Sequence, residues 1–129
     1  KGGRLAFERA CKLGDAASCK TAGDLVYARR DGKARYWLER GCEAGDASSC
    51  TDLAWMVWHG EGGAAEPARA ADLYDRACRG GDAAGCVFAA LFWERHPVAD
   101  GRADALRVRR LRERACALGD DFACPPEER

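Results

Sequence analysis

The stretch DRACRGGDAAGC, residues 75–86, indicates the fold because variants of it occur four times along the chain. Each copy reads acidic residue, Arg, small residue, Cys, two residues, Gly, Asp, and then a short run to a second Cys. The first cysteines of successive copies are 31, 36 and 38 residues apart, a period typical of helical repeat proteins. The copies are residues 8–19, 39–50, 75–86 and 113–124.

The Gly-Asp dipeptide in each copy predicts the end of one helix and the start of the next. Glycine adopts the left-handed conformation at helix ends, and aspartate can cap the following helix with its carboxylate. Leu73 and Tyr74, which precede the first cysteine of their copy, would share one face of the first helix. The second helix repeats apolar residues at spacings of three and four, as in Cys50, Leu53 and Val57. The sequence therefore predicts an all-α fold, an α/α solenoid of helix hairpins.

Eight cysteines in 129 residues are the most informative part of the composition. They form four pairs with seven residues between the partners, and no CxxC motif occurs. Zinc sites normally use tight ligand pairs and often histidine, whereas the only histidines are His59 and His96, so we predict no metal. Free buried thiols are the alternative, but the repeated spacing favours one disulfide within each hairpin. The predicted pairs are Cys11–Cys19, Cys42–Cys50, Cys78–Cys86 and Cys116–Cys124.

The composition and net charge argue against several classes of function. A content of 47% hydrophobic residues is enough for a folded core. Twenty-one basic and 21 acidic residues cancel, so we expect no nucleic-acid partner. We also expect no cofactor and no membrane span, because no apolar stretch is long enough. Four disulfides persist only in an oxidising compartment, which predicts a periplasmic or secreted protein.

The repeated residues resemble the cysteine-rich Sel1-like repeat proteins typified by the Helicobacter cysteine-rich proteins. The similarity rests on residues 73–74, 77–78, 81–82 and 86, and on Gly60 and Gly62 after the second helix of a hairpin. It implies tandem TPR-like hairpins of about 36 residues, each with the two cysteines seven residues apart. The sequence departs from this pattern at residues 30–33, at His96-Pro97 and at Pro125-Pro126.

The resemblance covers nearly the whole chain and predicts one Sel1-like repeat domain over residues 1–129. We expect about three and a half repeats, divided approximately into residues 1–30, 31–66, 67–101 and 102–124. The tail, residues 125–129, is expected to be disordered.

The resemblance further implies secreted or periplasmic proteins that bind partners, and some members are reported to bind or hydrolyse β-lactams. A serine β-lactamase needs a Ser-x-x-Lys motif, but Ser18, Ser48 and Ser49 lack a lysine three residues later. We therefore predict no enzyme activity and a scaffold or adaptor that binds a protein or peptide on a concave solenoid surface. The alternatives are an enzyme that binds or hydrolyses β-lactams or peptidoglycan fragments, and a mitochondrial intermembrane-space assembly factor.

Large apolar residues outside the main helical stripes are the candidates for partner binding. They are Trp55 and Leu91, each five residues after a second cysteine, and Phe88. His59, at the end of the same predicted helix as Trp55, is the fourth candidate. Trp55 could instead pack between neighbouring repeats, and His59 could simply be solvated.

The acid-Arg pair in each copy allows two interpretations. Stacked repeats would align these pairs along one side of the solenoid. The aligned pairs could bind a charged peptide, or they could form ion pairs between neighbouring repeats. The pairs are Glu8-Arg9, Glu39-Arg40, Asp75-Arg76 and Glu113-Arg114.

Overall fold

The computed structural model describes residues 2–28, 33–96 and 101–126. This part of the chain contains seven α-helices, one short 3-10 helix and no strand. The helices are α1 (Gly2–Lys12), α2 (Ala16–Ala28), α3 (Ala34–Glu43), α4 (Ala47–His59), α5 (Pro67–Arg79), α6 (Ala83–Arg95), α7 (Gly101–Ala117) and the 3-10 helix η1 (Asp121–Ala123).

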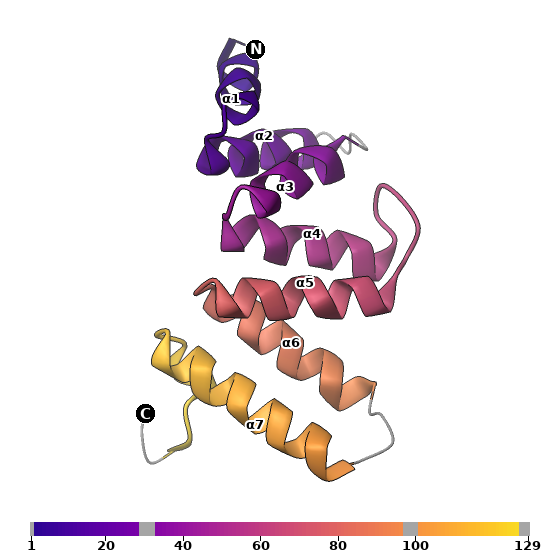
Figure 1. Cartoon of the computed structure of the whole chain (residues 1–129), viewed down its shortest axis with the longest axis vertical. Helices are drawn as coiled ribbons and strands as arrows, with labels where there is room; N and C mark the ends of the chain where they lie inside the picture. The colour runs from indigo at the N-terminus through magenta and orange to yellow at the C-terminus, as the bar shows by residue number, and fades with distance from the viewer. Residues whose placement is uncertain (1, 29–32, 97–100, 127–129) are drawn as a thin grey trace.

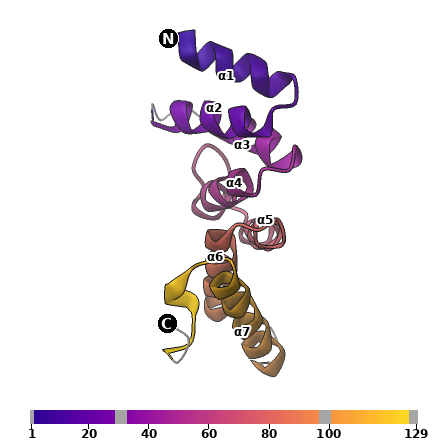
Figure 2. The same ribbon diagram turned by 90° about the vertical axis from the view of Figure 1, so that its left-hand side faces the viewer.

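The helices stack along one long axis, with the two ends of the chain at opposite ends of the stack (Figure 1). Each helix packs mainly against its neighbours in sequence, and weaker contacts link α2 with α4 and α4 with α6. Figure 2 shows the stack from the side. The predicted all-α solenoid of hairpins is therefore confirmed, with α1–α2, α3–α4 and α5–α6 as the first three units and α7–η1 as the fourth.

The same turn closes each hairpin. In the second unit Gly45 has a φ of +101°. Its N–H donates to the carbonyl of Cys42, and the N–H of Asp46 donates to the carbonyl of Gly41 at 2.9 Å. This pair of hydrogen bonds is the Schellman motif, which needs a left-handed residue and therefore selects glycine. Equivalent bonds and φ values of +98° to +104° recur at the other three turns.

A disulfide crosses every turn. The Cα atoms of Cys42 and Cys50 are 4.6 Å apart, and the other three pairs span 4.5 to 4.7 Å. The bonded pairs are Cys11–Cys19, Cys42–Cys50, Cys78–Cys86 and Cys116–Cys124, so no cysteine is free. Each crosslink joins the end of one helix to the helical turn that comes next in the chain.

The expected aspartate caps are only partly present. Asp120 accepts a hydrogen bond from the backbone N–H of Phe122. Asp46 occupies the N-cap position, but its carboxylate makes no such bond and accepts the hydroxyl of Ser49 at 2.6 Å. Asp82 likewise accepts from Thr51 of the preceding unit. These two carboxylates bind hydroxyls instead of backbone N–H groups because a hydroxyl within reach of an ionised carboxylate makes a strong charge-assisted hydrogen bond.

Small residues allow the two helices of a hairpin to approach closely near the disulfide. A Cβ atom on Gly85 would lie 2.6 Å from the Cβ of Ala77 and 3.0 Å from the backbone nitrogen of Cys78. Gly41 faces Ser49 in the same way in the second unit. Ala77 and the four cysteines of the first two units belong to a core that extends through the first three units, whereas Cys78 and Cys86 lie in a smaller cluster with Ala115.

The predicted limits of the four repeats stay a prediction. The limit between the first two repeats, at residues 30 and 31, falls outside the described residues, as does Pro97 of the His96-Pro97 departure. The tail is described only at Pro125 and Pro126, and residues 127–129 lie outside the described part of the chain.

Candidate interaction surface

Three of the four candidate binding residues come together on α4 and α6. The Trp55 ring stacks on the ring of His59, one turn later, with centroids 3.9 Å apart. The same indole meets the ring of Phe88 edge to face at 5.8 Å. Trp55 keeps 39% of its surface exposed, and His59 is exposed as well. We call Trp55, His59 and Phe88 the aromatic ridge.

Buried rings support the aromatic ridge from below. Phe88 stacks on Tyr74 of α5, which is fully buried. Trp58 is half-buried and contacts both Tyr74 and Phe92. Contacts between aromatic rings in such offset and edge-to-face geometries each add stability beyond their buried area. The exposed Trp55 ring is therefore held on a rigid base, which lowers the entropy lost when a partner binds.

Leu91, the fourth candidate, lies elsewhere. Its side chain is half-buried and lines a groove between α6 and α7 together with Val87 and Val108. The shared position relative to the second cysteine does not bring Trp55 and Leu91 to one site, because the two residues belong to successive units and face different neighbours.

A cavity of about 220 Å³ opens beside Trp55, between α2 and α4. Two carboxylates, Asp24 of α2 and Asp52 of α4, line it with Tyr27 and Trp55. Asp24 stands five residues after Cys19, the position that Trp55 holds after Cys50, and none of Asp24, Asp52 and Tyr27 was among the candidates chosen from the sequence. Asp52 lies two residues after Cys50, the position that Phe88 holds after Cys86, so the repeat pattern could have identified Asp52 as a candidate. We call Lys20, Asp24, Tyr27, Asp52 and Trp55 the α2–α4 site.

One ammonium group serves both carboxylates of this site. Lys20 Nζ lies 2.6 Å from Asp24 Oδ2 and 3.4 Å from Asp52 Oδ2. The hydrogen bond to Asp24 is the main cause that raises the pKa of Lys20. Burial raises the pKa of Asp52 and outweighs the attraction of Lys20, which lies closer to Asp24. The α2–α4 site thus contains two carboxyl groups but only one ammonium group.

The loop after α4 forms one rim of the site. The hydroxyl of Tyr27 donates to Glu61 Oε1 at 2.7 Å and so links α2 to this loop. Arg35 of α3 donates to the backbone carbonyls of Glu61, Met56 and Ala64 at 2.6 to 3.1 Å. These bonds satisfy carbonyls at and after the end of α4 and hold the rim in place.

Comparison with solved structures gives the fold its name. A Sel1 repeat protein from Oxalobacter formigenes matches 93% of this chain with a TM-score of 0.78 and 21% identity. A protective antigen of uropathogenic Escherichia coli, described as displaying an SLR fold, matches 93% of it with a TM-score of 0.79 and 20% identity. Helicobacter pylori cysteine rich protein B matches 93% with a TM-score of 0.71 and 24% identity.

The chain has the Sel1-like repeat fold. Its four disulfides fit the cysteine-rich form of that fold, as the resemblance predicted. No protein-family model matches the sequence, and no curated protein matches it. The chain spans 49% of the Oxalobacter protein, 27% of the Escherichia coli antigen and 88% of the Helicobacter protein.

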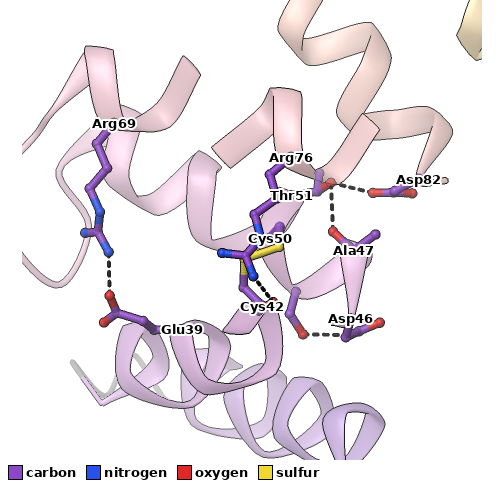
Figure 3. The surroundings of a disulfide bond; sticks show 10 residues. Glu39, Cys42, Asp46, Ala47, Cys50, Thr51, Arg69, Arg76 and Asp82 are labelled. Atoms are coloured by element: carbon purple, nitrogen blue, oxygen red, sulfur yellow. Dashed lines mark hydrogen bonds and ion pairs between the residues drawn. A yellow bond between two sulfur atoms is a disulfide. The ribbon is translucent and has the colours of Figure 1, made fainter. Parts of the chain in front are cut away.

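Three members of the acid-Arg pairs, Glu39, Arg76 and Arg114, connect successive Sel1-like units. Figure 3 shows Arg76 directed at the backbone carbonyl of Cys42, next to the disulfide of the preceding unit, at 3.1 Å. Arg114 makes the same contact one unit later, from Nε to the carbonyl of Cys78 at 2.9 Å. The last carbonyls of a helix have no partner within that helix, so an arginine from the next unit satisfies them and favours the negative end of the helix dipole.

Glu39, the acidic member of the second pair, also bonds to the next unit. Its carboxylate accepts from Arg69 of α5 at 2.5 Å (Figure 3). The interpretation of these pairs as contacts between repeats therefore fits Glu39, Arg76 and Arg114, although the two arginines bind carbonyl oxygens instead of carboxylates.

Two of the three serines have structural hydrogen-bond partners in this Sel1-like fold. The hydroxyls of Ser18 and Ser49 donate to Asp15 and Asp46, each three residues earlier. Within residues 2–28, 33–96 and 101–126, no group of three or more His, Cys, Asp and Glu side chains is placed to hold a metal ion. In the same ranges, no helix combines the length and apolar character that crossing a membrane requires.

Proposed function

We propose that this chain is a protein-interaction scaffold that acts in an oxidising compartment outside the cytoplasm, and that it binds a peptide segment of its partner at the α2–α4 site and the aromatic ridge. The observation that carries this proposal is the Trp55 ring, which is exposed over 39% of its surface although it stands on a rigid base of packed aromatic residues. Tryptophan is among the residues that contribute most to protein interfaces.

The charge of the site indicates the chemistry of the partner. Asp24 and Asp52 share the single ammonium of Lys20, so a second cation is attracted to the cavity. The neighbouring Trp55 ring lines the same cavity and offers a face on which an arginine or lysine can stack. We infer that the bound segment places a basic side chain there.

The disulfides support the proposed location. Each closes a ring of about nine residues, which stabilises the folded chain by about 2.5 kcal/mol in the chain-entropy model. Four such crosslinks together equal the net stability of a typical small domain, and reduction would remove it. The periplasm or the extracellular medium keeps such bonds oxidised.

The test begins with affinity capture from the native cell envelope with the oxidised protein, followed by calorimetry with the captured partner. Trp55→Ala is expected to weaken binding at least tenfold, which corresponds to about 1.4 kcal/mol. Asp52→Asn should weaken it less, because one carboxylate remains. Tyr36→Ala is the matched control, since Tyr36 on α3 is an aromatic residue with 49% of its surface exposed outside the site. Equal binding by the wild type and Trp55→Ala would refute the proposal.

Acidification provides a second readout of the same site. Because the pKa of Asp52 is raised, this carboxylate takes up its proton at a higher pH than an ordinary aspartate. Binding of a basic segment should therefore begin to weaken on acidification at a higher pH than an ordinary aspartate would cause, and Asp52→Asn should reduce this pH dependence. Turnover of a chromogenic β-lactam by the pure protein, without a captured partner, would favour the enzyme alternative instead.

A further inference from the structure

A cleft lined mainly by arginines lies between α5 and α7. These are the first helices of the third and fourth units, and the cleft between them has a volume of about 450 Å³. Both of its walls belong to described helices, so its shape depends on how these two units stack. We call it the α5–α7 cleft. Its charged lining residues are Asp75 and Arg79 of α5 and Arg107, Arg110 and Arg114 of α7.

The equivalent positions one unit earlier have a different balance of charge. Counted from the first cysteine of each unit, Arg79 corresponds to Glu43 and Arg110 corresponds to Asp72. Stacking of units therefore does not require arginine at these two positions, because the preceding pair of units stacks with acidic residues there. The other three positions keep the sign of their charge, since Asp75, Arg107 and Arg114 correspond to Glu39, Arg69 and Arg76, which Figure 3 shows.

Two of the arginines in the cleft are held in place by the third unit. Arg114 donates from Nε to the carbonyl of Cys78 at 2.9 Å and from Nη2 to the carbonyl of Arg79 at 3.2 Å. The guanidinium group of Arg107 lies over the ring of Trp93, 4.1 Å from its centroid. Neither contact involves a carboxylate, so both groups keep their attraction for an anion while their positions are fixed.

The positive charge of the cleft is only partly balanced. Asp75 is the one acidic residue among the described residues that line the cleft, and its carboxylate interacts electrostatically with Arg79 and Arg107. Arg110 is exposed and has no hydrogen bond or ion pair with any described residue. Four guanidinium groups thus surround one carboxyl group, and such a concentration of one sign of charge in a cleft attracts anions.

Leucines beside the arginines indicate the kind of anion. Leu106 is 37% exposed and Leu111 is half-buried, and both line the α5–α7 cleft. A free phosphate makes no use of apolar surface, whereas a peptide can place a carboxylate on the arginines and an apolar side chain on the leucines. Asp75 also repels a densely charged polyanion more strongly than it repels a single carboxylate.

We propose that the α5–α7 cleft binds an acidic segment of a partner protein, whose carboxylate contacts Arg107 and Arg110 while a neighbouring apolar side chain packs on Leu106. Arg107 and Arg110 are three residues apart on α7 and therefore neighbours on its surface, and guanidinium groups bind carboxylates through paired hydrogen bonds. Arg79 on the opposite wall accommodates a second carboxylate. This cleft shares no lining residue with the cavity of the α2–α4 site and prefers the opposite charge.

The test uses a short acidic peptide as the probe. The peptide is end-capped and fluorescent, and it alternates four glutamates with four leucines. Arg79→Glu combined with Arg110→Asp reproduces the charges of the same positions one unit earlier, so the fold should tolerate both changes, which circular dichroism checks. By fluorescence anisotropy we expect saturable binding to the oxidised wild type and at least tenfold weaker binding to this double variant.

A second pair of substitutions is the matched control. Arg9→Glu combined with Arg95→Asp makes the same change in net charge at two exposed arginines outside the cleft, and it should change binding less than threefold. Arg110→Gln alone should weaken binding about threefold, and this single variant keeps the test decisive if the double variant does not fold. Trp55→Ala should leave binding of the acidic peptide unchanged, so failure here and failure of the proposed function can be distinguished.

Several outcomes would overturn this proposal. They are the absence of saturable binding, equal weakening by the control pair and by the cleft pair, and unchanged binding to Arg110→Gln. Equal binding of a peptide with serine in place of leucine, together with its displacement by inorganic phosphate, would assign the cleft to small oxyanions. Sedimentation analysis provides a further outcome: self-association that is lost both in the cleft pair and in Asp52→Asn would assign the cleft to the α2–α4 site of a second copy of the chain.

Discussion

The second and fourth units of the molecule contain the same turn but not the same hairpin. In both, the aspartate after the left-handed glycine bonds back to the residue before the first cysteine, at 2.9 Å for Asp46 and 3.0 Å for Asp120. In both, a disulfide spans the turn with Cα atoms 4.6 to 4.7 Å apart. The second unit continues into 13 residues of helix and the fourth into three. The turn and the crosslink are thus local features, whereas the second helix depends on the residues after the second cysteine.

The surroundings of the crosslinks differ accordingly. Cys42 and Cys50 are each 2% exposed and belong to the core of the first three units. Cys116 is half-buried, and the cluster around Cys78 and Ala115 at this end of the chain is small. A solenoid unit gains much of its stability from its neighbours. Within the 129 residues of this chain, the described part of the fourth unit contacts the third unit and continues past the disulfide turn only into η1, so we expect this unit to open first.

The largest expected effect comes from removing one crosslink at a time. Cys42→Ala combined with Cys50→Ala should lower the free energy of unfolding by about 2 to 4 kcal/mol, because the unfolded chain gains freedom and a buried site loses volume. Cys116→Ala with Cys124→Ala should cost less, since the last turn can open while the core stays folded. Urea titration monitored by circular dichroism measures both. Equal losses would contradict the expectation that the fourth unit opens first.

A smaller effect is expected from one methyl group. Gly85→Ala places a Cβ 2.6 Å from that of Ala77 and should destabilise by about 1 to 3 kcal/mol, since the adjacent disulfide prevents the helices from separating. Ala123 occupies the same position in the fourth unit, and Ala123→Ser, which introduces the residue present at Ser18 and Ser49, should change stability by less than about 0.5 kcal/mol. Thermal denaturation compares the two variants.

A double-mutant cycle identifies the cause of the Gly85→Ala effect. If the two methyl groups collide, Gly85→Ala combined with Ala77→Gly will be more stable than the sum of the single changes. Strict additivity would place the cause outside this contact.

The smallest expected effect concerns the arginines between units. Arg76→Met should lower the free energy of unfolding by about 1 kcal/mol, because the carbonyl of Cys42 loses the charged one of its two donors and keeps only the N–H of Gly45. Arg114→Met should instead increase hydrogen exchange in α7 and leave the first three units protected. Arg40→Met serves as the control, since the guanidinium of Arg40 donates to Tyr36 within its own helix and this substitution removes no contact between units. Faster exchange throughout the chain in Arg114→Met would mean that the last unit supports the whole stack.

Local chemistry made much of this fold predictable. The left-handed glycine, the aspartate after it and the paired cysteines lie within 12 residues of each other in each copy, so their geometry depends on few neighbours. Trp55 could be selected as a candidate because it is a large apolar residue outside the apolar stripe of its own helix. Asp52 and Tyr27 could not, because their common cavity arises only when α2 and α4 pack side by side.

The sequence by itself determined the helix hairpins, their period and the turn at each disulfide, since these depend on backbone conformation and on residues close in the chain. Only the tertiary structure decided which carboxylates share Lys20, that Asp82 binds Thr51 of the preceding unit, and that Leu91 faces a different groove from Trp55. These contacts join residues of different helices. Their partners are set by the angle and distance at which neighbouring units stack, which no single repeat encodes.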